Sequence, residues 1–227
     1  MLSSLNQRII AQTEHWLAYH KPANVSLHSE SGTGLVAELK QQLRLEFLAP
    51  VHRLDKVTSG VLLLAKNSAA AAELSEQFAA RNVSKVYCAV TVGKPKKKQG
   101  AIVGDMVPAR RGDYRLTKSL INPAHTDFYS VGFQDGLRIA LLKPLTGKTH
   151  QLRVALKSIG SPILGDPRYA PKMIADRCYL HHYCLQFSFA SERFDIRALP
   201  EQGDHFLQPL FREIFLEKLA ALDWLAI

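Results

Sequence analysis

A short polar turn followed by an apolar run places the strongest constraint on how this chain can fold. Residues 52–60 read His-Arg-Leu-Asp-Lys-Val-Thr-Ser-Gly, and residues 61–65 read Val-Leu-Leu-Leu-Ala. A short apolar run that follows a glycine is typical of a buried strand. The hydroxyl side chains before Gly60 can hydrogen-bond the turn backbone, and the glycine permits a tight entry into the strand. We therefore expect a turn at the edge of a sheet, with Asp55 in it.

Asp55 lies two residues from Arg53 in this turn. A guanidinium beside a partly buried carboxylate keeps the carboxylate ionised and lowers its pKa. An ionised carboxylate suits a nucleophile, or a stabiliser of a cationic sugar while a glycosidic bond breaks. A lone aspartate near a turn is more often a cap or a surface charge, so the surrounding residues must decide between these interpretations.

The charge of the chain points to a polyanionic partner. Among 227 residues, 29 lysines and arginines oppose 20 acidic residues, which gives a formal net charge of +9. Nucleic acid and an anionic membrane surface both fit such a balance, as does a basic surface that binds nothing. No segment approaches the roughly 18–20 apolar residues of a membrane span. We therefore expect a globular protein that does not cross a membrane.

The three cysteines indicate a reducing compartment. Cys88, Cys178 and Cys184 form an odd set without a Cys-x-x-Cys pair, which argues against a disulfide framework. The first residues contain no apolar stretch of signal-peptide length, so we expect a cytoplasmic protein. His181 and His182 lie near two of the cysteines, but their spacing fits no tetrahedral zinc site, and we expect no metal.

Strands and helices are mixed along the chain without a regular βαβ alternation, which predicts an α+β fold with a mostly antiparallel mixed sheet and flanking helices. No internal repeat or clear linker is found, so we expect a single domain over residues 1–227. The expected strands are two on either side of a Lys-Pro turn within 14–28, and others over 61–66, over 84–92 and near 126–133 and 137–142. The expected helices lie over 33–47, over 69–81 with an N-cap at 67–68 and a stop at 82, over 150–159 closed by Gly160, and, as a packed helix, within 205–225. An exposed basic loop is expected over 93–100.

The nonamer at 52–60 resembles the HRLDxxTSG motif of the RluA-type pseudouridine synthases, in which the aspartate is catalytic. Further stretches resemble the same family in the same order, and the match runs from about residue 14 to 190. They are Tyr-His-Lys-Pro-Ala at 19–23, Lys-Val-Tyr at 85–87, Leu-Thr-Gly-Lys-Thr-His-Gln-Leu-Arg at 145–153 with its continuation at 160–169, and the Leu-His segment at 180–187. The resemblance implies the pseudouridine synthase fold, with Asp55 as the catalytic residue.

The reaction that this resemblance implies is the isomerisation of uridine to pseudouridine in RNA. The bond from the ribose to the base nitrogen breaks, the uracil turns over, and its carbon 5 bonds to the same ribose carbon. No redox change or energy input is needed, so no cofactor is expected. By resemblance, Tyr87 packs on the target uracil, Arg153 faces the catalytic aspartate, and Arg53 and Arg153 keep that carboxylate ionised and contact phosphate. Whether Asp55 attacks the sugar, attacks the base or removes a ribose proton stays open.

Two positions depart from the family pattern. Lys148 stands where the family more often has arginine, which keeps the charge but loses a bidentate fork. Val57 stands where an acidic residue is common. We expect both to affect RNA affinity more than catalysis. Because the first motif begins within twenty residues of Met1, we expect a short, monomeric member of the family without a separate N-terminal RNA-binding domain, with a motif-bearing core at about 14–190.

Several alternatives stay open at this point. The RNA partner is ribosomal or transfer RNA, and we favour ribosomal RNA. A non-catalytic RNA-binding or ribosome-assembly factor could keep the same fold, and a carboxylate-dependent glycosidase would need a second carboxylate, for which the only candidate is Asp166. Without the family context, Tyr87 would be a core aromatic, Arg153 a solvated charge, and the lysines of residues 94–98 a solvated loop.

Overall fold

The computed structural model describes residues 7–27 and 34–225. Its internal contacts divide the chain into two compact units. Unit 1 comprises Met1–Ser84 and His182–Leu199, and unit 2 comprises Lys85–His181 and Pro200–Ile227. The single catalytic domain expected from the sequence stays a prediction.

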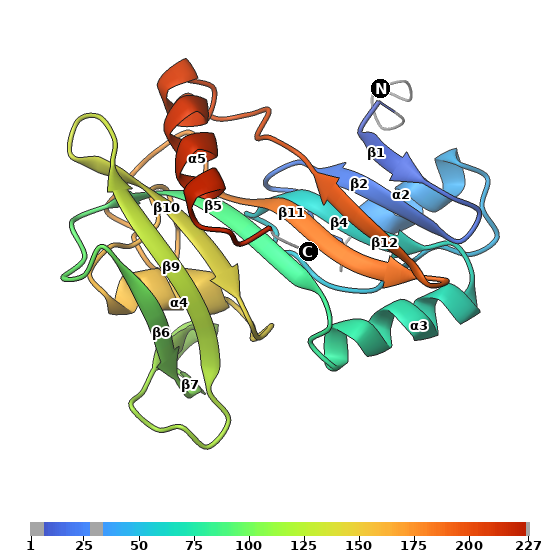
Figure 1. Cartoon of the computed structure of the whole chain (residues 1–227), viewed down its shortest axis with the longest axis horizontal. Coiled ribbons are helices and arrows are strands. Elements are labelled where there is room, and N and C mark those ends of the chain that lie inside the picture. The colour runs from blue at the N-terminus through green and yellow to red at the C-terminus, as the bar shows by residue number, and fades with distance from the viewer. Residues whose placement is uncertain (1–6, 28–33, 226–227) are drawn as a thin grey trace. The chain divides into compact units, whose positions relative to one another are not determined.

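Unit 1 is built on a sheet with the strand order β1, β2, β4 and β11, to which β3 and β12 are added (Figure 1). β2 and β4 are antiparallel along their whole length, from Trp16 opposite Ala65 to Lys21 opposite Gly60. All residues of both strands are buried, which confirms the strand predicted over 61–66. The strands of this unit are β1 (Ile9–Gln12), β2 (Trp16–Lys21), β3 (Ala49–Pro50), β4 (Ser59–Ala65), β11 (Leu180–Phe189) and β12 (Glu192–Arg197).

One strand expected in unit 1 is absent. The predicted strand after the Lys-Pro turn is wrong, because residues 22–27 form turns and irregular backbone; residue 28 lies outside the described residues. Two carbonyls of this segment, those of Pro22 and Val25, instead accept hydrogen bonds from the Lys21 ammonium at 2.9 and 2.8 Å. β2 pairs on one side with β1, which the sequence analysis did not predict.

Both helices of unit 1 overlap the ranges predicted for them. α2 (Leu35–Gln42) buries Leu35, Val36 and Leu39 but is shorter than the helix predicted over 33–47, of which residue 33 lies outside the described residues. α3 (Ser68–Ala79) begins after Asn67, whose side chain accepts a hydrogen bond from the Ala70 N–H at 2.8 Å, as predicted for an N-cap. Arg81, with φ of 62°, lies just beyond the α3 C-terminus, one residue before the predicted stop.

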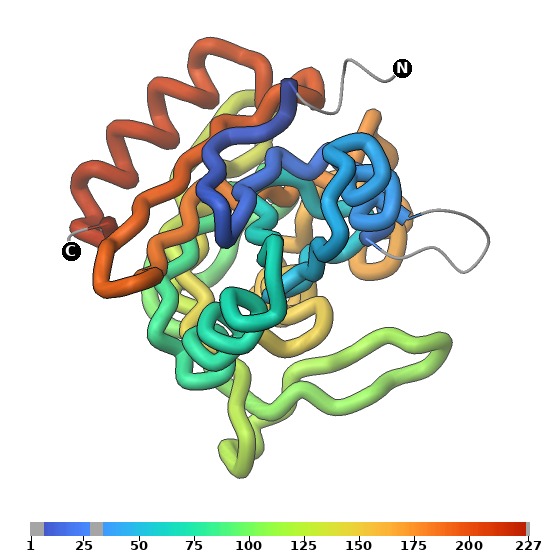
Figure 2. The backbone as a smooth tube through the Cα atoms, turned by 90° about the vertical axis from the view of Figure 1, so that its right-hand side faces the viewer, coloured from blue at the N-terminus to red at the C-terminus, as the bar shows by residue number. Residues whose placement is uncertain are grey.

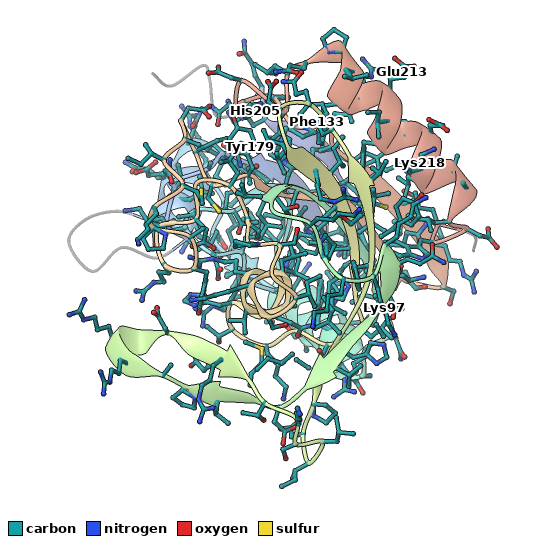
Figure 3. The ribbon with its side chains drawn as sticks, turned by 90° about the vertical axis from the view of Figure 1, so that its left-hand side faces the viewer. Lys97, Phe133, Tyr179, His205, Glu213 and Lys218 are labelled. Carbon is teal, nitrogen blue, oxygen red and sulfur yellow. The ribbon has the colours of Figure 1, made fainter. Side chains whose placement is uncertain are left out.

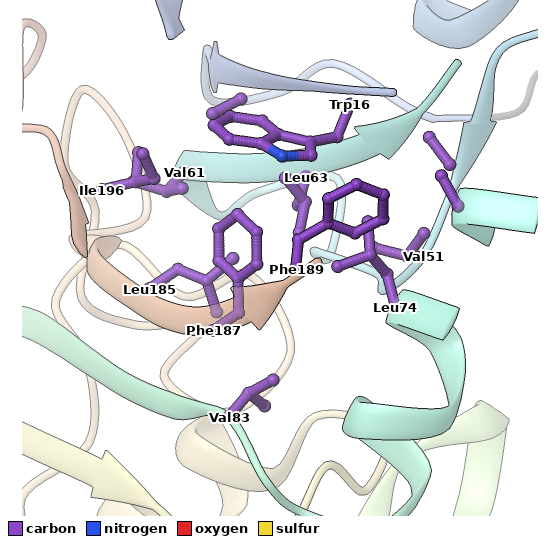
Figure 4. Close-up of a cluster of buried hydrophobic side chains, with 13 residues drawn as sticks. Trp16, Val51, Val61, Leu63, Leu74, Val83, Leu185, Phe187, Phe189 and Ile196 are labelled. Carbon is purple, nitrogen blue, oxygen red and sulfur yellow. The ribbon is translucent and has the colours of Figure 1, made fainter. Parts of the chain in front are cut away.

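The core of unit 1 lies between α3 and the sheet (Figure 4). Leu74 of α3 is fully buried together with Leu63 of β4. Trp16 of β2 packs edge-on against Phe187 of β11, with ring centroids 5.3 Å apart. Elements from residue 16 to residue 189 therefore meet in one apolar cluster, which fixes the strand that follows the 52–60 turn.

Unit 2 contains a second set of antiparallel strands in the order β5, β10, β9 and β6. α4 and α5 lie on opposite faces of β9 and β10 (Figures 1 and 3). The strand predicted over 84–92 has those bounds in the structure, and the strands predicted near 126–133 and 137–142 are confirmed as β9 and β10. The bounds are β5 (Ser84–Val92), β6 (Gln99–Gly104), β9 (Ala124–Gly132), β10 (Leu137–Pro144), α4 (Gln151–Ser158) and α5 (Pro209–Ala221).

The two helices of unit 2 were both predicted. α4 ends before Gly160, whose φ of 75° suits a glycine beyond a helix C-terminus. α5 buries Phe211, Phe215 and Leu219, in agreement with the predicted packed helix. Just before α5, the His205 ring contacts the Tyr179 ring at a centroid distance of 5.2 Å and the Phe133 ring at 6.4 Å. Glu213 and Lys218 lie on α5 itself (Figure 3).

A two-stranded hairpin extends from the rest of unit 2 (Figure 2). It consists of β7 (Met106–Pro108), the 3-10 turn η1 (Arg110–Gly112) and β8 (Tyr114–Leu116). The sequence analysis did not predict this hairpin, because strands of three residues are too short to show an alternating pattern. No helix of the described residues is long and apolar enough to cross a membrane.

Candidate active site

The turn that carries Asp55 connects β3 to β4 in unit 1. The Thr58 N–H donates to the Asp55 carbonyl at 3.0 Å, which closes a tight turn. Thr58 and Ser59 are buried, whereas the Asp55 side chain is half-buried. The turn is therefore packed against the unit while its carboxylate retains some contact with solvent.

A buried lysine ties this turn to the Lys-Pro segment. Lys21 is fully buried. Its ammonium donates to the carbonyls of Pro22 and Val25 and, at 3.2 Å, to the carbonyl of Lys56, the residue after Asp55. Burying a cation is costly unless its donors are satisfied, so these bonds fix the backbone beside Asp55. The Lys-Pro pair at 21–22 was the one signal for this role that sequence analysis could have used.

Gly60 is required by its backbone conformation and by a close neighbour. Its φ is 115°, and a Cβ at this position would lie 2.2 Å from the backbone oxygen of His182 on β11. One ring nitrogen of His182, Nδ1, lies 2.6 Å from the Val61 carbonyl. The tight entry into β4 predicted from the sequence is confirmed, and its cause is the approach of the β11 backbone.

Arg53 lies in the same turn as Asp55. Its side chain is exposed, while the intervening Leu54 is buried. The Arg53 side chain is therefore accessible to an anionic ligand, and its predicted role beside Asp55 stays a prediction.

Unit 2 contains a buried ion pair between α4 and the loop that follows it. Arg153 is 3% exposed and Asp166 is 0% exposed. The Arg153 Nε and one terminal nitrogen donate to the two carboxylate oxygens of Asp166, each at 2.8 Å. Burial raises the pKa of Asp166, but the hydrogen bonds and charge of Arg153 outweigh it and hold that pKa below its usual value. Arg153 is thus not the solvated charge that its position on an amphipathic helix would suggest.

The same loop binds the base of the hairpin. The Asp166 carboxylate also accepts the backbone N–H groups of Arg168 and Tyr169, at 2.9 and 3.0 Å. The Tyr169 hydroxyl accepts the Tyr114 N–H of β8 at 3.1 Å and lies 2.9 Å from Nδ1 of His150. Arg168 also binds the hairpin, through the Arg111 carbonyl at 3.0 Å, so both Tyr169 and Arg168 connect the hairpin to the Arg153–Asp166 pair.

Gln151 organises the loop before α4. Its side-chain oxygen accepts hydrogen bonds from the Thr146 hydroxyl at 2.7 Å and the Lys148 N–H at 2.9 Å. Its side-chain nitrogen donates to the His125 carbonyl and the Thr126 hydroxyl at 3.0 and 2.9 Å. All hydrogen-bonding positions of this buried amide are used, so the 145–153 motif is rigidly attached to β9.

The remaining predicted residues of unit 2 lie on strands and loops. Tyr87 lies on β5 opposite Leu142 and is 8% exposed. Lys96 and Lys97 are exposed, as predicted for a basic loop. The Lys98 ammonium lies 5.1 Å from the centre of the Tyr129 ring.

The described residues contain no cluster of three or more side chains that could hold a metal ion. The three cysteines are buried and form no disulfide.

The sequence of residues 15–158 matches the family described as RNA pseudouridylate synthase. The chain belongs to this family. The predicted family and reaction class are confirmed: the protein is an RNA pseudouridine synthase, an isomerase.

Relatives of the synthase are found in several bacteria. A protein of Haemophilus influenzae named as an uncharacterized RNA pseudouridine synthase is 44% identical over 209 residues, which cover 91% of this chain and 93% of the relative. The dual-specificity RNA pseudouridine synthase RluA of Escherichia coli is 34% identical over 189 residues, 76% and 83% of the two chains. Ribosomal large subunit pseudouridine synthase C of Vibrio parahaemolyticus is 30% identical over 203 residues, and the match spans 84% of this chain but 64% of the relative.

Solved structures agree with the sequence relatives. Human RNA pseudouridylate synthase domain containing 1 is similar with a TM-score of 0.73 at 26% identity, over 94% of both chains. Human RNA pseudouridylate synthase domain containing 4 gives a TM-score of 0.74 at 26% identity, over 93% of this chain and 95% of that one. The predicted α+β class with a mostly antiparallel sheet is confirmed.

Proposed function

We propose that the synthase isomerises specific uridines of ribosomal RNA, in the cytoplasm, with Asp55 as the catalytic residue. The observation that carries this proposal is the intact nonamer at 52–60, folded as a turn that leaves the Asp55 carboxylate half-buried beside a fixed backbone. Ribosomal RNA is favoured over transfer RNA because a relative from Vibrio parahaemolyticus is named for the large ribosomal subunit. The Escherichia coli relative is named for dual specificity, which supports testing a second class of RNA, and transfer RNA is the second class that we propose.

Each proposed site residue has a separate role. Asp55 reacts with the sugar or the base, or takes a proton from the ribose, while the bond between ribose and base nitrogen breaks. Tyr87 packs on the uracil, and its buried place on β5 gives the ring a fixed orientation. Arg153 contributes positive charge near the reacting groups, and the exposed Arg53 contacts a phosphate.

The RNA must present its uridine outside a base-paired stack for this chemistry. Extruding a nucleotide from a helix costs a few kcal/mol, so loops and single-stranded segments are the favoured targets. The uracil then rotates and bonds through carbon 5, whose proton is lost as the nitrogen regains one. The atoms balance without an oxidant, a reductant or a cofactor.

Pseudouridine mapping of cellular RNA tests this proposal. RNA from cells with and without the gene would be compared, with complementation by the wild type, by Asp55→Asn and by Asp135→Asn. Asp135 is an exposed aspartate with φ of 51° in the turn between β9 and β10, where asparagine fits equally well. We expect a ribosomal site that is lost on deletion and restored by the wild type and Asp135→Asn but not by Asp55→Asn.

The other outcomes are equally informative. Rescue by Asp55→Asn would overturn the catalytic assignment. A lost site in transfer RNA would correct the substrate class and leave the catalytic proposal standing. Absence of any lost site would favour an RNA-binding or ribosome-assembly role on the same fold.

A further inference from the structure

An exposed apolar loop follows the hairpin of unit 2. Leu120 is 64% exposed and Ile121 is 92% exposed. Both belong to residues 117–122, called here the 117–122 loop, which leads from β8 towards β9. Large aliphatic side chains that are this exposed do not gain the free energy of removing apolar surface from water. Two of them on one rigid loop therefore indicate a binding function.

A single carboxylate fixes the shape of this loop. One oxygen of Asp105 accepts the Ser119 hydroxyl at 2.6 Å and the Ile121 N–H at 3.1 Å, and the other accepts the Asn122 N–H at 2.9 Å. The hydrogen bond from Ser119 is the main cause that lowers the pKa of Asp105. The backbone N–H of Asp105 also donates to the Ser119 carbonyl at 2.8 Å. The loop is therefore organised before any ligand binds.

Close packing and a second side chain strengthen this arrangement. A Cβ on Gly104 would lie 2.1 Å from the Thr117 carbonyl oxygen, so the loop approaches the end of β6 as closely as a glycine permits. The Lys148 ammonium donates to the Asn122 side-chain oxygen at 2.8 Å. Lys148 is itself bound through its N–H to Gln151 at the start of α4. The 117–122 loop is thus joined to the helix that carries Arg153.

The charges around the loop favour a polyanion. Residues 105–122 contain four basic side chains, and Arg110, Arg111, Arg115 and Lys118 are all exposed. The two acidic side chains of the same segment are engaged in structure. Asp105 holds the loop, and Asp113 forms a salt bridge with Arg168 at 2.9 Å. A segment with exposed cations and engaged carboxylates suits a ligand that has phosphates beside apolar ring faces.

We propose that Leu120 and Ile121 form a contact for an unstacked base of the substrate RNA. This inference rests on the proposed function and adds to it a determinant of RNA recognition. Aliphatic side chains can replace a neighbouring base by packing on the face of an unstacked one, as apolar wedges do in nucleic acids. The contact reads no hydrogen-bond pattern, so it selects RNA whose bases leave the stack easily. Because the loop is already ordered in the free enzyme, binding costs less conformational entropy.

Kinetics with a stem-loop RNA test this proposal. The substrate would span the uridine identified by mapping, and the variant would combine Leu120→Ser with Ile121→Ser. We expect KM to rise about 10-fold, within the range of losses found when a base-stacking side chain is removed, with kcat changed less than about twofold. The slope of log affinity against log salt should stay the same, because the substitutions remove no phosphate contact.

A spectroscopic measurement separates base contact from general weakening. The stem-loop would carry 2-aminopurine in turn at each base that flanks the uridine. Wild-type enzyme at saturation should raise the fluorescence at one position, where the base leaves the stack. The double variant, also at saturation, should lose at least half of that rise.

The matched control removes exposed apolar surface elsewhere. Leu207 is 58% exposed and Leu210 is 44% exposed, near the start of α5. Leu207→Ser with Leu210→Ser should leave KM, kcat and the fluorescence unchanged. A second variant, Asp105→Asn, keeps both apolar residues but removes an acceptor from the loop, and we expect a KM increase of about threefold, smaller than for the double serine variant.

Two failures can be distinguished. If the wild type converts no uridine in any RNA, the proposed function fails. If the wild type converts uridine but the Leu120 and Ile121 variant matches the α5 control in KM and fluorescence, this inference alone is overturned, and the two side chains belong to a protein contact instead.

Discussion

Asp55 in unit 1 and Asp166 in unit 2 are both in family motifs, yet their surroundings differ in kind. Asp166 is fully buried, and its two oxygens accept four hydrogen bonds from Arg153, Arg168 and Tyr169. Asp55 is half-buried, in a turn whose backbone is held by Lys21 and Thr58. A fully buried carboxylate that accepts four hydrogen bonds holds structure together, whereas one with remaining access to solvent can meet a substrate. We infer that Asp→Asn substitution at the two positions will have opposite consequences.

The largest expected effect is on the turnover of Asp55→Asn. We expect the rate of pseudouridine formation by purified enzyme to fall by about a thousandfold or more, as is usual when a reacting group is removed. RNA affinity should stay within a few-fold of wild type, and the free energy of unfolding should fall by less than it does for Asp166→Asn. Single-turnover kinetics, RNA binding and urea unfolding check the three quantities. Substantial residual turnover would contradict the proposal that Asp55 is catalytic whereas Asp166 is structural.

Asp166→Asn should act on stability. It removes the negative charge that compensates the buried Arg153, and breaking a buried ion pair costs about 3–5 kcal/mol. We expect the free energy of unfolding in urea to fall by an amount in this range, with Asp135→Asn as the control that changes an exposed aspartate. A variant as stable as the control would contradict the structural role assigned to Asp166.

Gly60→Ala should show that the Asp55 turn depends on backbone packing. Strain at a φ of 115° costs about 1–3 kcal/mol, and the clash with the His182 backbone adds an overpacking cost. Gly136→Ala is the matched control, because Gly136 has φ of 74° but no atom within 4 Å of the place where the added methyl group would lie. Urea unfolding of both variants separates strain from overpacking. Equal losses would mean that the approach of β11 does not constrain the turn.

The acid dependence of stability should report the contribution of the Arg153–Asp166 pair. The pKa of Asp166 is lowered in the folded state, whereas an unfolded aspartate titrates near about 3.9. The contribution of the pair is therefore complete above about pH 4 and is lost as the pH falls through the lower, folded-state pKa. We expect the stability difference between wild type and Asp166→Asn to be largest near about pH 7 and to narrow towards about pH 2. Urea unfolding across this range would show a constant difference if the ion pair contributed nothing.

The smallest effect is expected from the basic loop of unit 2. Replacement of Lys96, Lys97 and Lys98 by glutamine should weaken RNA binding generally and flatten its salt dependence. Each lost phosphate contact lowers the log–log slope by roughly 0.7–0.9. Binding titrations between about 50 and 200 mM salt measure the slope. An unchanged slope would mean that these lysines are only a solvated loop.

Local patterns in the sequence were sufficient to predict much of the fold. The apolar run at 61–65 was correctly predicted as a buried strand, Asn67 caps α3 as its side chain favours, and the alternation at 84–92 matches β5. The ordered motifs were sufficient to predict the family. Short strands such as those of the hairpin escaped prediction because three residues do not define a period.

How the motif residues are used could not be predicted in the same way. The position of Arg153 on an amphipathic helix suggested a solvated charge, but Arg153 is buried and is paired with Asp166, from a loop thirteen residues further along the chain. Lys21 and Gly60 act through backbone atoms of residues distant in the sequence. Strands, helices and caps could be predicted from the chain alone, because they depend on nearest neighbours along it. Burial, ion pairing and close backbone approach depend on neighbours in space, so only the tertiary structure determines them.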